Sequence, residues 1–270
     1  MNERLSDNRI AVVPAAIIVI AEVFFYLEQP IPTFAIHGVN LLLCILLPVF
    51  LPIRPYLLPA FSLLSVLRML NVGMPEFFSL TLYWLPLIYG PLIPAAYITL
   101  KKDEVYRKRI DSLKGRVKSS FVSRFDELGV EWSWYYLPLG ILISIPLAVS
   151  EYLVLRPDMM VPELTPLYLL SLLLVMVLFV GFVEEVVFRS ILQTRLQNNF
   201  GDWAGIVTAS IFFGILHSGY SSMEYVFFVF LIGMFLGYLF HKTRSVAFVT
   251  IIHGFLNFFL FSVLAANIII

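Results

Sequence analysis

Long apolar segments separated by short polar connections make up most of this chain. A helix needs about 20 predominantly apolar residues to span the hydrocarbon core of a bilayer, and nine segments approach that length. The second and third are separated only by Arg54 and Pro55, and the seventh is too short to span without help. We therefore predict an all-α fold, a polytopic transmembrane bundle of about eight to nine helices. The nine segments are Ile10–Leu27, Phe34–Ile53, Pro55–Val72, Phe77–Leu100, Trp134–Leu155, Pro166–Phe188, Trp203–His217, Met223–Phe240 and Val246–Ile269.

One long polar stretch interrupts this pattern. Between Lys101 and Glu131 there are nine Lys or Arg residues against six Asp or Glu residues, and an excess of basic residues is typical of cytoplasmic loops. We predict a cytoplasmic basic loop over residues 101–133, after about four transmembrane helices in residues 1–100 and before a helical core in residues 134–270. No clear small-residue cleavage site follows the first apolar segment, so we expect a retained helix there.

Composition supports a multi-pass membrane protein. Of the 270 residues, 60% are hydrophobic and 13% are charged, whereas a soluble domain is roughly 25% charged. The formal net charge is zero, so charge gives no argument for a nucleic-acid partner, and we expect membrane lipids to surround the protein. The single cysteine, Cys44, has no partner for a disulfide and is expected to be a small buried apolar residue.

The first hundred residues contain few polar groups within apolar segments. These groups lie near predicted helix ends or stand alone, so we interpret this half as a scaffolding or lipid-facing bundle. They are Glu22, His37, Asn40, Arg68 and Asn71.

Ionisable residues inside a membrane are costly, and each is a candidate functional residue. The first cluster in the later segments reads Glu184-Glu185-Val-Val-Phe-Arg189. Glu185 and Arg189 are four residues apart and share a helix face, so they can form an ion pair. Glu184 points to another part of the helix surface and has no partner on its own helix, which suits a general base. The alternative is a purely structural ion-pair cluster of all three residues.

The second cluster is Phe213-Gly-Ile-Leu-His217. A lone histidine in an apolar helix is more often a core residue, but a predicted hairpin changes that interpretation. A turn is expected at Asn199–Gly201, about 16 residues after Glu184 and about 16 before His217. In an antiparallel helix pair, Glu184 and His217 would then lie at the same depth.

The third cluster is His253-Gly-Phe-Leu-Asn257. Because His253 and Asn257 are four residues apart, both project from one face of the last helix. No plausible nucleophilic serine or cysteine accompanies the three clusters, so water is the expected nucleophile. Glu184, together with His217, would deprotonate this water, while His253 and Asn257 would donate hydrogen bonds to the developing oxyanion.

A cofactor is not required by this chemistry, and we expect none. The alternative is zinc bound by Glu184, His217 and His253, with Glu185 as the base, although the sequence has no His-Glu-x-x-His motif. Two other functions stay open from the residues alone. The same polar groups suit a proton- or ion-coupled transporter, or they are structural contacts in a non-catalytic scaffold.

In order and spacing, the motifs EEVVFR (184–189), FGILH (213–217) and HGFLN (253–257) resemble those of the CPBP family. This family comprises CAAX prenyl proteases of the Ras-converting type and bacteriocin-processing Abi relatives. The resemblance implies a glutamate-dependent intramembrane endopeptidase whose catalytic helical core spans residues 134–270. It implies a site that opens to the cytoplasm and a peptide or prenylated protein as substrate.

The resemblance also assigns roles to individual residues. Glu184 and His217 match the pair that activates water, and His253 and Asn257 match the oxyanion stabilisers. The supporting residues are Glu185 and Arg189, which match an ion pair, and Phe213, which matches a packing aromatic. The chain departs from the family at Ser190, where glycine is frequent.

Overall fold

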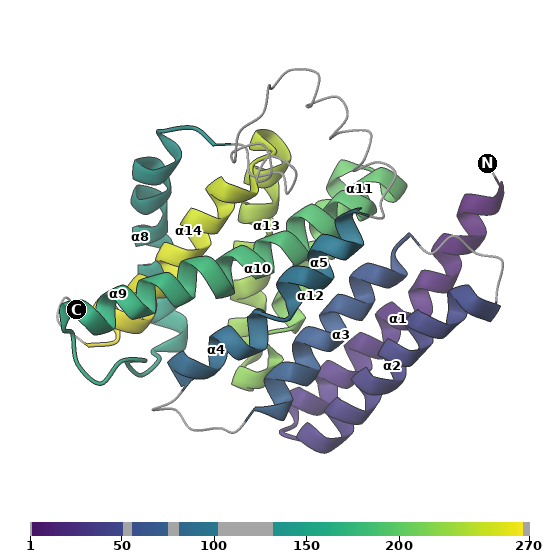
Figure 1. Cartoon of the computed structure of the whole chain (residues 1–270), viewed down its shortest axis with the longest axis horizontal. Helices are drawn as coiled ribbons and strands as arrows, with labels where there is room; N and C mark the ends of the chain where they lie inside the picture. Colours follow the sequence, from purple (N-terminus) through teal and green to yellow (C-terminus); the bar gives the residue numbers. More distant parts are fainter. Residues whose placement is uncertain (1, 51–55, 75–80, 102–131, 267–270) are drawn as a thin grey trace. The chain divides into compact units, whose positions relative to one another are not determined.

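The structure is a computed structural model that describes residues 2–50, 56–74, 81–101 and 132–266, with side chains described from residue 10 onward. Within these ranges the chain forms helices and no strand, as Figure 1 shows. The predicted all-α class is therefore confirmed. The basic loop and Arg54 fall outside the described residues, so the predicted division at 101–133 stays a prediction.

The described helices correspond to the predicted apolar segments. Seven are long and apolar enough to cross a membrane, and two shorter apolar helices cover Ile10–Tyr26 and Leu58–Gly73. Together they make the chain an integral multi-pass membrane protein. The helices are α1 (Asn2–Tyr26), α2 (Pro30–Phe50), α3 (Leu58–Gly73), α4 (Thr81–Tyr89), α5 (Leu92–Lys101), α8 (Tyr136–Leu155), α9 (Pro166–Leu174), η2 (Val175–Gly181), α10 (Phe182–Glu185), η3 (Val186–Gln193), α11 (Thr194–Phe200), α12 (Asp202–Ile215), η4 (Ser218–Tyr220), α13 (Met223–Thr243), α14 (Val246–Phe259) and η5 (Leu260–Leu264).

The sixth segment is longer than predicted. We expected it to end at Phe188, but the helix continues from Pro166 to Phe200 through the π-helical segments η2 and η3. Arg189 does not end it because its charge is paired with Glu185 inside the protein. The chain turns at Gly201, whose φ of 93° suits glycine, so the expected turn near Asn199–Gly201 is present.

Two further segments have irregular ends or breaks. The fourth is interrupted at Gly90 and Pro91, between α4 and α5, because proline cannot continue a helical hydrogen-bond ladder. The seventh is extended by the 3-10 segment η4, so the helical segment Asp202–Tyr220 reaches 19 residues. It is therefore longer than the predicted segment that ended at His217.

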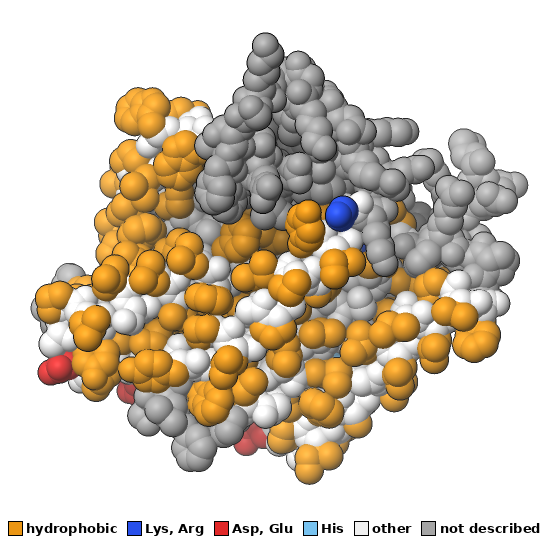
Figure 2. All heavy atoms as spheres, in the orientation of Figure 1, with side chains coloured by type: hydrophobic (Ala, Val, Ile, Leu, Met, Phe, Trp, Pro, Cys, Tyr) orange, Lys and Arg blue, Asp and Glu red, His pale blue; other side chains and the backbone are white. Residues whose placement is uncertain are grey.

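By packing, the chain divides into two compact units. The first unit comprises residues 1–75 and 191–237, and the second comprises residues 76–190 and 238–270. In the first unit, α1, α2 and α3 lie side by side (Figure 1). Hydrophobic side chains cover most of the described surface visible in Figure 2, as expected for helices whose outer faces contact lipid.

In the second unit, α14 is the buried central helix. It packs against α8 and η2. In the most apolar stretch of the span Val246–Leu264, 78% of the residues are buried, against 22% in the corresponding stretch of α8. The motif that contains His253 and Asn257 lies on α14. The helix that carries this motif is thus shielded from lipid by its neighbours.

The helix α14 crosses η2 at a contact between glycines. A Cβ added at Gly254 would lie 2.7 Å from the Cα of Val177, and one added at Gly181 would lie 3.0 Å from the backbone nitrogen of Gly254. Small residues allow membrane helices to approach each other this closely. Gly254 follows His253 directly, and Gly181 lies three residues before Glu184, so this contact sets the distance between the first and third motifs.

The substitution Gly254→Ala should therefore destabilise the protein. The added methyl group meets backbone atoms of Val177 that cannot rotate away, and overpacking of this kind costs about 1–3 kcal/mol. Gly38→Ala in α2 is the matched control, since a Cβ there lies 3.7 Å from the end of the Met69 side chain, an ordinary contact. Thermal unfolding of the two variants in detergent measures the difference. Equal melting temperatures would contradict the close helix contact.

Candidate active site

Glu185 is a fully buried charged group of the second unit, with 0% of its surface exposed. One carboxylate oxygen, Oε2, accepts a hydrogen bond of 2.9 Å from Nε of Arg189, one helical turn later. The other, Oε1, lies 2.9 Å from Nδ1 of His253 on α14. The ion pair predicted from the four-residue spacing is thus present, and the same carboxylate also holds the histidine of the third motif.

Glu184 has different surroundings, although it is the next residue. It is 5% exposed, and its Oε1 accepts a hydrogen bond from the hydroxyl of Tyr89 on α4. Its Oε2 lies 3.9 Å from Nε2 of His253, too far for a hydrogen bond. Within the described part of the chain, this buried oxygen has no hydrogen-bond partner. One oxygen of Glu184 is therefore fixed, and the other is available for a small polar molecule.

The backbone around the two glutamates is unusual for a membrane helix. Only α10 has α-helical geometry there, and the π-helical segments η2 and η3 flank it on both sides. π-Helical bulges are rare and occur frequently at functional sites. Glu184 and Glu185 both lie in the α-helical turn between these segments, about 100° apart around the helix axis, so they face different neighbouring groups.

Asn257 lies one turn after His253 on α14 and is partly exposed. The spacing predicted these two side chains on one face of the last helix, and both lie on a single α-helix as expected. Asn257 is therefore placed on the same side of α14 as the histidine that Glu185 holds.

Phe213 and His217 belong to the first unit. His217 follows the end of α12, and its Nδ1 donates a hydrogen bond of 2.8 Å to the carbonyl oxygen of Phe213. A neutral ring held in this way carries its proton on Nδ1 and can accept a proton at Nε2. The buried Phe213 ring packs against the imidazole at 5.1 Å between centroids. The convergence of His217 with Glu184 stays a prediction.

Sequence reasoning missed two residues near the second-unit carboxylates. Tyr89 gave no signal, because one tyrosine among 13 in an apolar chain is unremarkable by pattern alone. Glu151 on α8 is 5% exposed and interacts electrostatically with His253. Its position as an ionisable residue inside the predicted segment Trp134–Leu155 could have marked it.

The interpretation of the N-terminal polar residues is wrong in one respect. We expected Glu22, His37, Asn40 and Arg68 to stand alone or to lie at helix ends. They are instead buried and joined by hydrogen bonds across α1, α2 and α3. The sequence did not indicate this, because the partners are 15 to 46 residues apart and no local spacing connects them.

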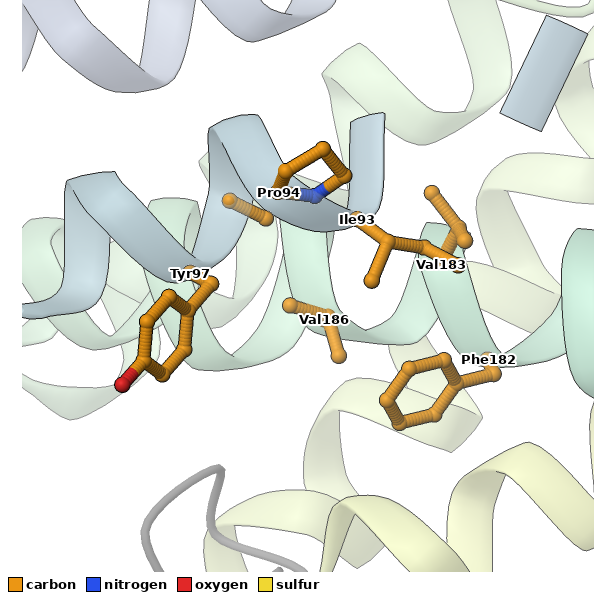
Figure 3. A pocket seen from close by; sticks show the side chains of 7 residues that line it. Ile93, Pro94, Tyr97, Phe182, Val183 and Val186 are labelled. Atoms are coloured by element: carbon orange, nitrogen blue, oxygen red, sulfur yellow. The ribbon is translucent and has the colours of Figure 1, made fainter. Parts of the chain in front are cut away.

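An apolar pocket of about 290 Å³ lies beside the first motif in the second unit. Figure 3 shows side chains of α5 facing side chains of the helix that carries Glu184. Val183, which lines the pocket, directly precedes that glutamate. The pocket can therefore hold an apolar group against the helix that carries the carboxylates. The lining residues are Ile93, Pro94, Ala96, Tyr97, Phe182, Val183 and Val186.

The zinc alternative requires at least three ligand side chains close together. Among the described residues, no group of three or more His, Cys, Asp or Glu side chains is arranged to hold a metal ion. Glu185, the base in that alternative, has both oxygens engaged by Arg189 and His253. Its surroundings thus fit a structural ion-pair role better than that of a base.

Comparison with known proteins finds a family match over part of the chain. Residues 166–259 match the family model described as type II CAAX prenyl endopeptidase, Rce1-like. No match was found among curated proteins or among solved structures. The matched segment contains all three motifs, from Glu184 to Asn257. Residues 166–259 are therefore similar to type II CAAX prenyl endopeptidases of the Rce1-like kind, which supports the resemblance to the CPBP family of intramembrane proteases.

Proposed function

We propose that this protein is an intramembrane endopeptidase that hydrolyses a peptide bond with a water molecule activated by Glu184 and His217. One observation carries the proposal. Glu184 is a buried carboxylate with one oxygen fixed by Tyr89 and the other without a hydrogen-bond partner among the described residues. Buried polar atoms are nearly always hydrogen-bonded, so this oxygen is suited to bind water.

Glu184 would act as the general base. Its free oxygen can accept a proton from the water as the water attacks the carbonyl carbon of the substrate. His217 would share this water through Nε2, the nitrogen left as acceptor when Nδ1 donates to Phe213. Breakdown of the tetrahedral intermediate requires a proton for the leaving amine, and the protonated Glu184 or His217 can supply it.

His253 and Asn257 would stabilise the oxyanion. The Nδ1 atom of His253 contacts Glu185, so Nε2 is the atom that would donate to a substrate oxygen. With a proton on Nδ1, donation from Nε2 requires a doubly protonated ring, and the carboxylates of Glu185 and Glu184 lie beside that ring. The amide of Asn257 would provide a second donor. Arg189 would balance the charge of Glu185.

The substrate would be a peptide segment with an apolar attachment, such as a prenylated C-terminus. The apolar pocket lined by Val183 supports this inference, because it can accept a hydrocarbon group against the helix that carries Glu184. The site would open to the cytoplasmic side, as the basic composition of residues 101–133 indicates. Surrounding lipids would be the other partner, and no nucleic acid is expected.

Glu184→Gln should abolish peptide cleavage, with a loss of at least about a thousandfold, because an amide cannot accept the proton of water. The measurement is turnover by purified protein in nanodiscs, with a prenylated C-terminal peptide and its unprenylated form as substrates. Glu224→Gln is the matched control, since Glu224 is exposed at the start of α13 and its substitution should leave turnover unchanged.

Full turnover by Glu184→Gln would end the proposal. A pH-driven ion flux in liposomes that is lost in this variant, with no peptide cleavage by the unaltered protein, would favour a transporter instead. A change in stability with no measurable reaction in any form would favour a scaffold.

Tyr89→Phe should lower kcat about tenfold with little change in KM, since it removes the hydroxyl that donates to Glu184 Oε1 and fixes it. Loss of one hydrogen bond to a charged group costs about 1.5–3 kcal/mol, and here the bond orients the base rather than the substrate. Tyr83→Phe on the same helix is the control, because Tyr83 is 59% exposed. Equal kcat for the two variants would show that Tyr89 does not position Glu184.

Exhaustive chelation should leave cleavage unchanged, because the proposed mechanism uses carboxylate, imidazole and amide groups alone. The measurement is turnover before and after chelation, together with the metal content of the purified protein. Loss of activity that returns on addition of zinc, with one bound ion per chain, would establish the metal alternative with Glu184, His217 and His253 as candidate ligands.

A further inference from the structure

A buried ion pair lies in the first unit, far along the chain from the family motifs. Glu22 on α1 is 2% exposed and Arg68 on α3 is 5% exposed. The guanidinium binds the carboxylate with two hydrogen bonds of 2.8 Å, from Nε to Oε1 and from Nη2 to Oε2. His37 on α2 adds a contact of 3.1 Å to Oε1. Three N-terminal helices therefore meet at one carboxylate.

This ion pair also holds the backbone on both sides of His217. The hydroxyl of Ser218, the next residue, donates a hydrogen bond of 2.6 Å to Oε2 of Glu22. Nη2 of Arg68 donates a hydrogen bond to the carbonyl oxygen of Leu216, the preceding residue. Arg68 thus binds the residue before the histidine, and Glu22 binds the residue after it.

Packing reinforces these polar contacts. Phe25 lies one turn after Glu22 on α1, and its ring stacks under the guanidinium of Arg68 at 4.3 Å. A Cβ at Gly219 would collide with the same ring, so the chain after Ser218 can approach α1 only because residue 219 is glycine. A further hydrogen bond of 3.3 Å joins Ser221 Oγ to the carbonyl oxygen of Tyr26.

His217 needs such support because it has no regular helix around it. The α-helix α12 ends at Ile215, and the chain then forms the short 3-10 segment η4. The last carbonyl groups of a helix have no partner within it, and irregular backbone inside a membrane protein must be hydrogen-bonded by other groups. Arg68 supplies a donor to one of these carbonyl groups.

We propose that the Glu22–Arg68 pair is a positioning element for His217. This inference rests on the proposed function, in which His217 shares the reactive water with Glu184. By fixing Leu216 and Ser218, the pair sets the direction of the imidazole. The N-terminal helices would then contribute to catalysis without contacting the substrate, although they lie outside the segment matched by the family model.

Ser218→Ala tests this inference with a minimal change, since it removes one hydrogen bond and leaves the ion pair intact. We expect kcat to fall about tenfold at nearly constant KM, because small misplacements of a catalytic group are costly. Ser210→Ala is the matched control. Ser210 is a buried serine on α12 whose hydroxyl donates within its own helix, to Ile206, and its substitution should leave kcat unchanged.

The second readout is the nuclear magnetic resonance signal of the His217 ring nitrogens. The protein has four histidines, so selective labelling gives few signals, and the one that disappears in His217→Ala is assigned to residue 217. Ser218→Ala and the isosteric Glu22→Gln should both shift this signal, whereas Ser210→Ala should not. This measurement does not require turnover, so it separates the inference from the proposed peptidase activity.

An unchanged kcat and an unchanged His217 signal in both folded variants would overturn the inference, even if their melting temperatures fell. A shifted signal with no peptide cleavage by the unaltered protein would retain the positioning role and reject the proposed function.

Discussion

A charged group inside a membrane helix is tolerated when a partner neutralises it, and the second unit is built around one such group. Glu185 is fully buried, and its two oxygens bind Arg189 on its own helix and His253 on α14. Removing one partner of a buried pair costs about 3–5 kcal/mol, because a charge is left uncompensated. Glu185 therefore ties α10 to α14, and the glycines at their crossing permit the short distance that these bonds require.

This pairing gives two adjacent carboxylates different properties. Glu185 has no oxygen left for a substrate, whereas Glu184 has one oxygen fixed by Tyr89 and one without a protein partner in the described ranges. Since the two residues are adjacent on one helix, their difference arises from the neighbouring groups that each of them faces. Glu184 therefore has what a general base needs, because one oxygen is oriented by the protein while the other stays open to water.

The sequence predicted what depends on local spacing. Helix number and class follow from apolar length, and the Glu185–Arg189 pair follows from the four-residue repeat of a helix. The sequence could not predict contacts between distant residues, such as Tyr89 with Glu184 or Arg68 with Glu22, because no periodicity connects them. The predicted helix end at Phe188 was wrong for a related reason. An unpaired arginine is expected at the water interface, whereas Arg189 is neutralised by Glu185 inside the protein.

The same physical rule explains why charged residues occur on the N-terminal helices. A histidine placed just after a helix end leaves carbonyl groups that need donors, and in a membrane protein water is not freely available to supply them. An arginine can satisfy such a carbonyl, but a buried arginine needs an acid, and the acid then needs its remaining oxygen positions filled. These requirements are met next to His217: Arg68 donates to the carbonyl oxygen of Leu216, Glu22 neutralises Arg68, and Ser218 donates to Glu22. The cost of burying the pair thus follows from placing a histidine on irregular backbone, and this accounts for an ion pair that a simple lipid-facing scaffold would not need.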